Sequence, residues 1–190
     1  MVTPMTQRLT ADAWTEMGLR VLAEQGVEAV RVEPLARALG VTKGSFYWHF
    51  SDRRELLDSM LLQWRQLATH DVIEMVERAS DEPVERLREL TRLAFFHGGP
   101  LDKAVRAWAA HDETAATAIA RVDSERYSFV RRLLEEHGLP EETAAVRARL
   151  LYTSLVGEQH TSLRLSRKRR VDWALSNLDW LLDWSGGSET

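Results

Sequence analysis

Residues 35–50 read LARALGVTKGSFYWHF, and their order is typical of two short helices that cross at a sharp turn. Ala36 is small where crossing helices must approach closely, and Gly40, four residues later, suits the left-handed conformation that ends a helix. Val41 can fill the gap between the helices, and Thr42 can cap the next one. This order predicts a helix-turn-helix, with an ordinary helical corner as the alternative.

The rest of the chain is predicted to be helical too. Gly and Pro fall almost wholly at breaks, and no stretch alternates apolar and polar residues for long enough to form a strand. A long helix is predicted from Asp52 to about Ser80, because this stretch has no Gly or Pro and Asp52 with Glu55 resembles a capping box. The other predicted helices span about 10–25, 32–39, 43–49, 82–97, 103–111, 114–137, 141–165 and 171–184. The chain is therefore expected to be all-α, with about nine helices.

The composition is that of a globular protein, with 44% apolar and 28% charged residues among 190. The chain has no Cys, which excludes disulfide scaffolds, thiolate zinc sites and cysteine nucleophiles. No apolar run is long enough to span a membrane, and the first ten residues lack a secretory signal, so a cytoplasmic location is expected. Residues 1–54 carry seven Lys or Arg and six Asp or Glu, whereas the remainder carries eighteen and twenty-three. This weak asymmetry agrees with a polyanionic partner but does not establish one.

Further residues around the turn match the N-terminal signature of the tetracycline-repressor (TetR) family of bacterial transcription regulators. The matching positions are Gly26, Ala29, Leu35, Ala36, Gly40, Val41, Thr42, Lys43, Gly44, Ser45, Phe46, Tyr47, His49, Phe50, Arg53 and Leu56. The resemblance covers about residues 9–57. It implies a three-helix DNA-binding domain (residues 1–54) followed by a helical ligand-binding and dimerisation domain (residues 55–190). The chain departs from the family at Val30-Arg31, where a Thr pair is usual.

Candidate DNA contacts follow from this motif. Thr42 to Ser45 are expected at the start of the third helix, where free N–H groups favour phosphate and side chains point toward base edges. Tyr47 and His49 resemble the family's phosphate contacts, and Trp48 can press on a thymine methyl or pack on the protein itself. Phe46 and Phe50 are expected in the core. The predicted DNA-binding residues are Arg31, Thr42, Lys43, Gly44, Ser45, Tyr47, Trp48, His49 and Arg53.

The last two predicted helices favour a dimer. At about 100° per residue, Trp173, Trp180 and Trp184 fall opposite a face formed by Val171, Leu175, Leu178 and Leu182. A helix that is apolar on both sides is expected to be buried on both sides, by its own core and by a partner, although tryptophans that line an internal cavity are the alternative. The predicted interface residues are Leu150, Ser154, Gly157, Thr161, Trp173, Trp180 and Trp184.

Aromatic side chains between these two regions are candidates for a ligand pocket, because the family encloses a small molecule there. An aromatic residue at helical spacing is more often an ordinary core residue than a pocket residue, and this is the alternative for each of them. The predicted pocket residues are Trp64, Phe96, Trp108, His111, Tyr127 and Tyr152.

Other functions find less support in the sequence. His70 with Glu74, and Glu158 with His160, complete no metal-ligand pattern, and no nucleophile elbow, phosphate-cradling glycine loop or zincin motif occurs. No catalytic residue, metal or cofactor is therefore predicted. The basic run Arg167–Arg170 is interpreted as a solvated linker at the end of a helix, with contact to lipid or nucleic acid as the alternative.

The expected function is that of a homodimeric repressor that a small-molecule effector releases from a palindromic double-stranded DNA operator. A regulator of the same fold that ignores ligands, or that activates, is one alternative. A helical binding module or enzyme with a vestigial helix-turn-helix is the other.

Overall fold

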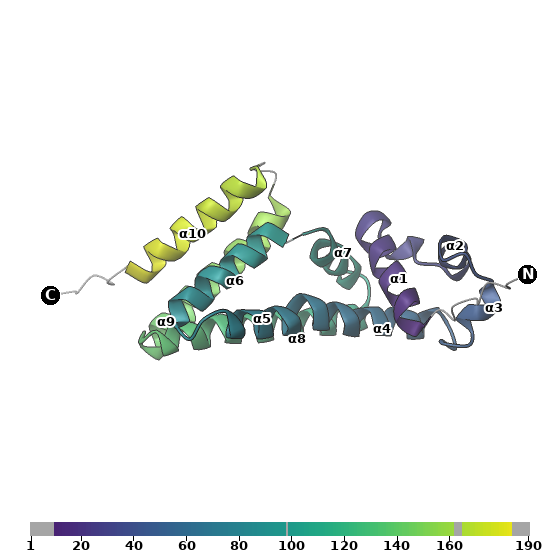
Figure 1. Cartoon of the computed structure of the whole chain (residues 1–190), viewed down its shortest axis with the longest axis horizontal. Helices are drawn as coiled ribbons and strands as arrows, with labels where there is room; N and C mark the ends of the chain where they lie inside the picture. The colour runs from purple at the N-terminus through teal and green to yellow at the C-terminus, as the bar shows by residue number, and fades with distance from the viewer. Residues whose placement is uncertain (1–9, 98, 162–164, 184–190) are drawn as a thin grey trace, which may run out of the picture. The chain divides into compact units, whose positions relative to one another are not determined.

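The computed structural model describes residues 10–97, 99–161 and 165–183, and all regular secondary structure in these ranges is helical (Figure 1). The α-helices are α1 (Ala11–Gln25), α2 (Val32–Ala38), α3 (Lys43–Phe46), α4 (Arg53–Arg65), α5 (Asp71–Ala79), α6 (Pro83–His97), α7 (Pro100–Ala109), α8 (Glu113–Glu136), α9 (Glu141–His160) and α10 (Arg167–Asp183). A 3-10 turn, η1 (Val27–Ala29), and a π-helical stretch, η2 (Gln66–His70), complete them. Because η2 joins α4 to α5 without a break, the described residues form nine continuous helical segments. The predicted all-α fold is confirmed.

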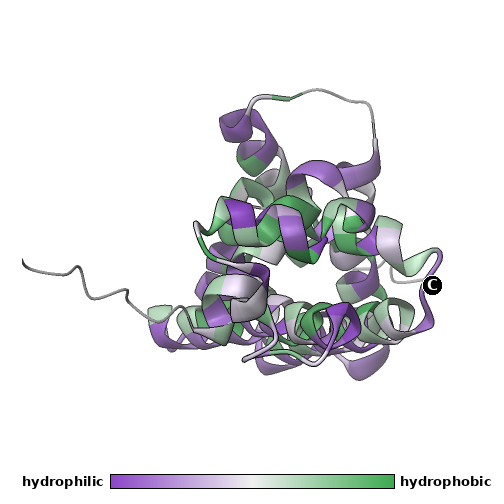
Figure 2. Cartoon of the chain, turned by 90° about the vertical axis from the view of Figure 1, so that its right-hand side faces the viewer, coloured by the Kyte–Doolittle hydropathy of each residue, from purple (hydrophilic) through white to green (hydrophobic). Residues whose placement is uncertain are grey.

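The chain divides into two compact units. Unit 1 comprises the described residues of Met1–Arg65 and Pro100–Ile119, so that α7 and the start of α8 belong with α1 to α4. Unit 2 comprises the described residues of Gln66–Gly99 and Ala120–Thr190. In Figure 2 the helices carry both apolar and polar residues around their circumference, as helices with one buried side do.

An aromatic core holds the helices of unit 1 together. Trp14 and Phe46 are fully buried, with ring centroids 5.3 Å apart, and the Phe50 ring lies 5.3 Å beyond Phe46. Gly18 allows α1 to approach α4, since a Cβ atom there would lie 2.6 Å from the Met60 sulfur. The expectation that Phe46 and Phe50 are core residues is confirmed.

The turn between α2 and α3 has the geometry that the sequence predicts. Gly40 has a φ of +69°, which residues with a Cβ rarely adopt. Its N–H donates to the Arg37 carbonyl, and the N–H of Val41 donates to the Ala36 carbonyl. These two bonds form a Schellman motif, which satisfies the last carbonyls of α2 and turns the chain into α3.

The start of α4 differs from the predicted capping box by one residue. The Asp52 carboxylate accepts from the Glu55 N–H at 2.9 Å, as expected. The Glu55 carboxylate, however, accepts from the Ser51 N–H at 2.6 Å rather than from that of Asp52. The two carboxylates still satisfy N–H groups on both sides of the helix start, which fixes where α4 begins.

The stretch η2 interrupts what the sequence predicts as one regular α-helix. Thr69 in this stretch is 1% exposed. Arg126 of α8 donates from Nε to the Thr69 hydroxyl at 3.1 Å and from Nη2 to the Ala68 carbonyl at 2.9 Å. The widened turn is thus held to α8 by one guanidinium, a long-range contact that periodicity cannot predict.

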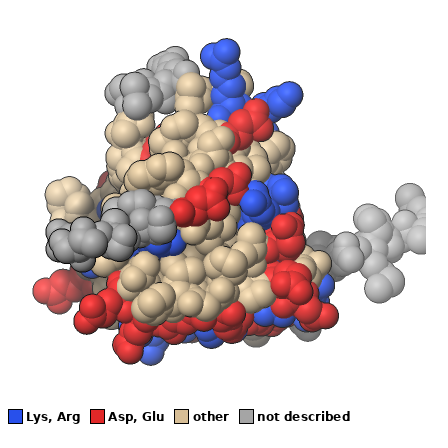
Figure 3. Space-filling view, turned by 90° about the vertical axis from the view of Figure 1, so that its left-hand side faces the viewer, with Lys and Arg blue, Asp and Glu red and all other residues tan. Residues whose placement is uncertain are grey.

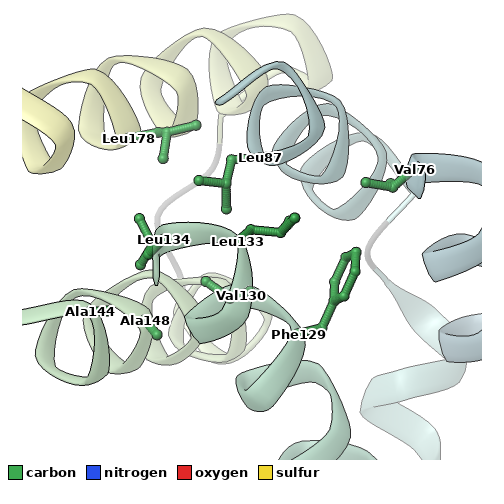
Figure 4. Packing of buried hydrophobic residues seen from close by; sticks show 9 residues of the cluster. All are labelled: Val76, Leu87, Phe129, Val130, Leu133, Leu134, Ala144, Ala148 and Leu178. Atoms are coloured by element: carbon green, nitrogen blue, oxygen red, sulfur yellow. The ribbon is translucent and has the colours of Figure 1, made fainter. Parts of the chain in front are cut away.

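Unit 2 has a largely aliphatic apolar core to which five helices contribute (Figure 4). Its buried members are Val76, Leu87, Phe129, Val130, Leu133, Leu134, Ala144, Ala148 and Leu178. Arg147 of α9 is also buried, at 5% exposure, and donates to the Leu182 carbonyl in the last turn of α10 at 3.2 Å. The core therefore fixes one side each of α9 and α10.

The basic run at 167–170 is not a linker, contrary to the prediction. It forms the first turn of α10, where the Ser166 hydroxyl accepts from the Arg169 N–H at 3.3 Å. The prediction placed these cations at the carbonyl end of the preceding helix, where they are favourable, whereas cations at a helix N-terminus are unfavourable. The Arg167 guanidinium lies 5.6 Å from the centre of the Phe96 ring, and this contact favours the earlier start.

Candidate nucleic-acid interface

The turn that follows α3 presents two aromatic side chains to solvent. Trp48 is 86% exposed and Tyr47 is 54% exposed, whereas Phe46 immediately before them is completely buried. At this exposure the Trp48 side chain has few contacts with the described residues, so the alternative that it packs on its own chain is wrong. The buried Phe46 fixes the backbone from which both exposed rings project.

Lys43, the first residue of α3, forms an ion pair that the sequence did not predict. Its ammonium group lies 2.5 Å from a carboxylate oxygen of Glu33 on α2, and the two side chains are 51% and 59% exposed. The hydrogen bond from Lys43 lowers the pKa of Glu33, and the same bond raises the pKa of Lys43. Both groups are therefore charged at neutral pH. The ten-residue separation along the sequence gives no periodic signal for this pair.

The other residues at the start of α3 remain accessible. Thr42 occupies the N-cap position, as predicted, but its hydroxyl makes no capping hydrogen bond, and Ser45 and His49 are half-buried. Gly44 is exposed, and a Cβ atom there would lie 3.7 Å from the Thr42 hydroxyl, an ordinary contact. The helix itself ends at Phe46, not at His49 as predicted, and one turn of helix carries only a small dipole. Side chains rather than the helix dipole must supply most of any affinity for DNA here.

Two arginines predicted to contact phosphate lie in different environments. Arg31 is exposed and precedes α2 with extended backbone, and it makes no capping bond. Arg53 is half-buried and donates from Nε to the Val30 carbonyl at 2.6 Å and from Nη2 to the Val27 carbonyl at 2.7 Å. Arg53 thus holds the η1 segment against α4. No sequence pattern predicts this structural role.

A second ion pair links the first turn of α4 to the N-terminal end of α8. Arg54 donates from Nη1 to the Asp112 carboxylate at 2.7 Å, and the other Asp112 oxygen accepts from the Ala115 N–H at 2.9 Å. Burial acts to raise the pKa of Asp112, but the Ala115 and Arg54 hydrogen bonds outweigh it and the pKa is lowered. Asp112 therefore caps α8 as a carboxylate.

The predicted pocket residues are divided between the two units. In unit 1, Trp64 is fully buried and donates to the Asp102 carboxylate at 3.0 Å, Trp108 is 5% exposed, and His111 is exposed. In unit 2, Tyr127 donates to the Ala145 carbonyl at 3.4 Å and Tyr152 to the Asp123 carboxylate at 2.7 Å. Phe96, also in unit 2, is 46% exposed. Asp102 and Asp123 are the polar partners that sequence patterns missed.

The predicted interface residues lie on exposed or half-buried surface of α9 and α10. Trp173 is 44% exposed, Trp180 63% and Leu150 47%, while Ser154 and Gly157 are half-buried. These exposures contradict the alternative in which the tryptophans line an internal cavity. Thr161 is exposed just after α9, and Trp184 lies outside the described residues. Figure 3 shows the side of the molecule on the left of Figure 1, where uncharged surface occupies the centre and acidic residues crowd the lower margin.

The surroundings of His70 and Glu74 and the apolarity of the helices bear on two other kinds of site, a metal site and a membrane span. His70 pairs with Glu125 at 3.4 Å, while Glu74 pairs with Arg78, so the predicted spacing of His70 and Glu74 creates no joint site. Among the residues that the structure describes, no group of three or more His, Asp or Glu is placed to hold a metal ion. None of the described helices combines the length and the apolarity needed to cross a membrane.

Relatives of known description match part of the chain. The family model "Bacterial regulatory proteins, tetR family" matches residues 15–60. The HTH-type transcriptional regulator AcrR of Shigella flexneri is 30% identical over 40% of this chain, and the HTH-type transcriptional repressor KstR2 of Mycobacterium tuberculosis is 30% identical over 42%. The aligned part covers 35% of AcrR and 40% of KstR2, less than half of either relative.

Solved structures match over nearly the whole chain. A transcriptional regulator from Rhodococcus sp. Rha1 has a TM-score of 0.71 at 21% identity, covering 92% of this chain and 94% of that structure. AibR, solved in complex with isovaleryl coenzyme A and operator DNA, has a TM-score of 0.63 at 21% identity, covering 90% and 97%. At this identity the likeness concerns the fold. The match to the family of bacterial regulatory proteins described as "tetR family" is confined to residues 15–60, so similarity to that family is shown for this part of the chain.

Proposed function

We propose that this chain is a transcriptional repressor that binds a palindromic DNA operator as a homodimer. Residues 1–54 would bind DNA, and residues 55–190 would dimerise and bind an effector. The observation that carries this proposal is the surface around α3, where Lys43, Tyr47 and Trp48 are exposed above a closed aromatic core. Exposed cations and aromatic rings on a helix-turn-helix suit a phosphate backbone and the major groove. Such a regulator acts on DNA in the cytoplasm and needs no catalytic residue.

A two-fold dimer is the arrangement that gives such a motif useful specificity. One helix-turn-helix reads few base pairs, and two of them must lie about 34–36 Å apart to reach successive major grooves. The exposed large apolar side chains Leu150 of α9 and Trp173 and Trp180 of α10 support this dimer, because exposed apolar surface is typical of interaction sites.

An effector would act by binding one arrangement of the protein more tightly than another. A ligand with equal affinity for the DNA-bound and the free arrangement shifts no equilibrium. Within unit 1, the buried pair of Trp64 and Asp102 supports an effector site, because an apolar surround with a few polar groups is typical of ligand pockets. The structure of AibR with both isovaleryl coenzyme A and operator DNA also supports a regulator of this kind.

The test begins with DNA selected from a random pool by the full chain. We expect a palindrome, and a lower affinity for it in the variants Lys43→Ala and Tyr47→Ala at fixed salt. Removal of a cation that contacts phosphate should lower the slope of log K against log salt by about one unit, whereas Tyr47→Ala removes no charge and should leave the slope unchanged. Lys103→Ala is the matched control, because Lys103 is an exposed cation on α7. Selection of no sequence over heparin would refute the proposal.

The sign of regulation and the effector need two further measurements. Transcription in vitro from a promoter that contains the selected palindrome should fall when the protein is added. Candidate acyl thioesters and hydrophobic drugs are then added to the complex, and release of the DNA identifies a responsive regulator. Increased transcription would instead identify an activator of the same fold.

A further inference from the structure

We propose that Glu33 and Lys43 together read one guanine–cytosine base pair in each half-site of the operator. The Lys43 ammonium would donate to guanine O6 or N7, and the Glu33 carboxylate would accept from the cytosine N4 amino group. This inference rests on the proposed function, which supplies the duplex, and extends it by naming a base pair and the acidic residue that helps to select it.

The geometry presents both charges together at the reading surface. The two groups are 2.5 Å apart, and more than half of each side chain is exposed. They project from the first turn of α2 and the first residue of α3. The backbone beneath them is fixed, because Leu35, Ala36 and Phe46 are buried. A pair held in this way can meet one base pair without a large loss of backbone freedom.

Electrostatics explain why a carboxylate in this place needs a specific partner. Phosphates repel Glu33, and Lys43 neutralises it instead of adding its full charge to phosphate binding. In the major groove, however, a carboxylate finds hydrogen-bond donors in the amino groups of cytosine and adenine. Glu33 is therefore a poor phosphate-facing residue but a suitable reader of a base edge.

The order of donors and acceptors selects the G·C pair. Across the major groove a G·C pair presents two acceptors, N7 and O6 of guanine, and then one donor, N4 of cytosine. An A·T pair presents an acceptor, a donor and a second acceptor. With the carboxylate at the position that cytosine N4 occupies in the G·C pair, thymine O4 would therefore lie against it. One cation beside one anion matches the G·C order in a single orientation.

The variant Glu33→Gln tests this inference, since an amide both donates and accepts. Glu24→Gln is the matched control, because Glu24 is an exposed carboxylate on α1 and its substitution changes the net charge equally. DNA is selected from a random pool with the wild type and both variants. In the palindrome selected by the wild type, each G·C pair is then replaced by A·T and by the reversed pair, and binding is titrated at one salt concentration.

We expect the wild type and Glu24→Gln to lose about tenfold in affinity or more when one particular G·C pair in each half-site is changed. Glu33→Gln should bind the original and changed DNA within about threefold of each other at that position and keep its preferences elsewhere. If Glu33→Gln changes the affinity for all sequences equally, Glu33 only neutralises Lys43 and the inference is wrong while the proposed function stands. If the wild type selects no palindrome, the proposed function fails and the inference fails with it.

Discussion

Both units expose tryptophan, but the residues around the exposed rings differ. In unit 1, Trp48 is 86% exposed and follows directly on the helix that begins with Lys43. In unit 2, Trp180 is 63% exposed on the same helix as the exposed Trp173, and the neighbouring helix in the sequence adds Leu150. An aromatic ring beside a cation suits a nucleic acid, whereas aromatic rings with aliphatic and small residues suit another protein surface. Exposure alone marks a contact surface, and the neighbouring charges indicate the class of partner.

The largest expected effect comes from placing a negative charge at an exposed tryptophan of each surface in turn. Trp180→Glu should weaken the dimer by about 4 kcal/mol, since a buried interface tryptophan often contributes about 2 kcal/mol or more and a two-fold interface contains it twice. Sedimentation at micromolar concentration should then show a monomer, and affinity for a full palindrome should fall with it.

Trp48→Glu is the reciprocal control and should leave the dimer intact while it weakens DNA binding. The same substitution in the two units would thus separate the two functions. A dimer that survives Trp180→Glu but is lost in Trp48→Glu would invert the assignment of partners.

A smaller effect, on the free energy of unfolding, should distinguish two cations of unit 1, Arg53 and Lys43. Arg53→Met leaves the Val30 carbonyl without its guanidinium donor in a half-buried site, and should lower the free energy of unfolding by about 2 kcal/mol. Lys43→Met removes an exposed, solvent-screened ion pair and should lower the free energy of unfolding much less than Arg53→Met does. Urea unfolding of both variants checks this, and equal losses would show that Arg53 has no special structural role.

The sequence predicted the surface around α3 better than it predicted the contacts beneath that surface. Gly40, Ala36 and the breaks at Gly and Pro are local signals, because one residue alone limits the backbone at each position. They were sufficient to predict the helix-turn-helix and the all-α fold.

The missed features are side-chain contacts between residues far apart in the sequence. Lys43–Glu33, Arg53 with Val27 and Arg126 with Ala68 all depend on how helices pack, and no periodic pattern encodes them. The start of α10 was misplaced for a related reason. A local rule about charge and helix ends opposed it, and a contact with the Phe96 ring of α6 favours it.

The smallest effect concerns Asp112, at the start of α8 in unit 1. Asp112 caps α8 and pairs with Arg54, and its pKa is lowered in the folded protein. A carboxyl with a lowered pKa stabilises the fold above its ordinary pKa of 3.8, and this contribution disappears as the pH falls through the folded-state value below 3.8. Asp112→Asn keeps a capping oxygen but removes the charge. At pH 6 it should be about 1 kcal/mol less stable than the wild type, because the ion pair is partly exposed and contributes little beyond the charged cap.

The difference between the two proteins should shrink as the pH falls below 3.8 and through the lowered pKa of Asp112, where the wild type takes up a proton. Urea unfolding at a series of pH values from 6 downward measures the loss, and hydrogen exchange at Ala115 and Ala116 locates it at the start of α8. If Asp112→Asn also changes the exchange rates throughout α9 and α10, the two units do not unfold separately. The difference between their surfaces would then have no matching difference in stability. A difference that stays constant as the pH is lowered would mean that the asparagine disturbs packing, and the charge of Asp112 would then not be what stabilises this junction.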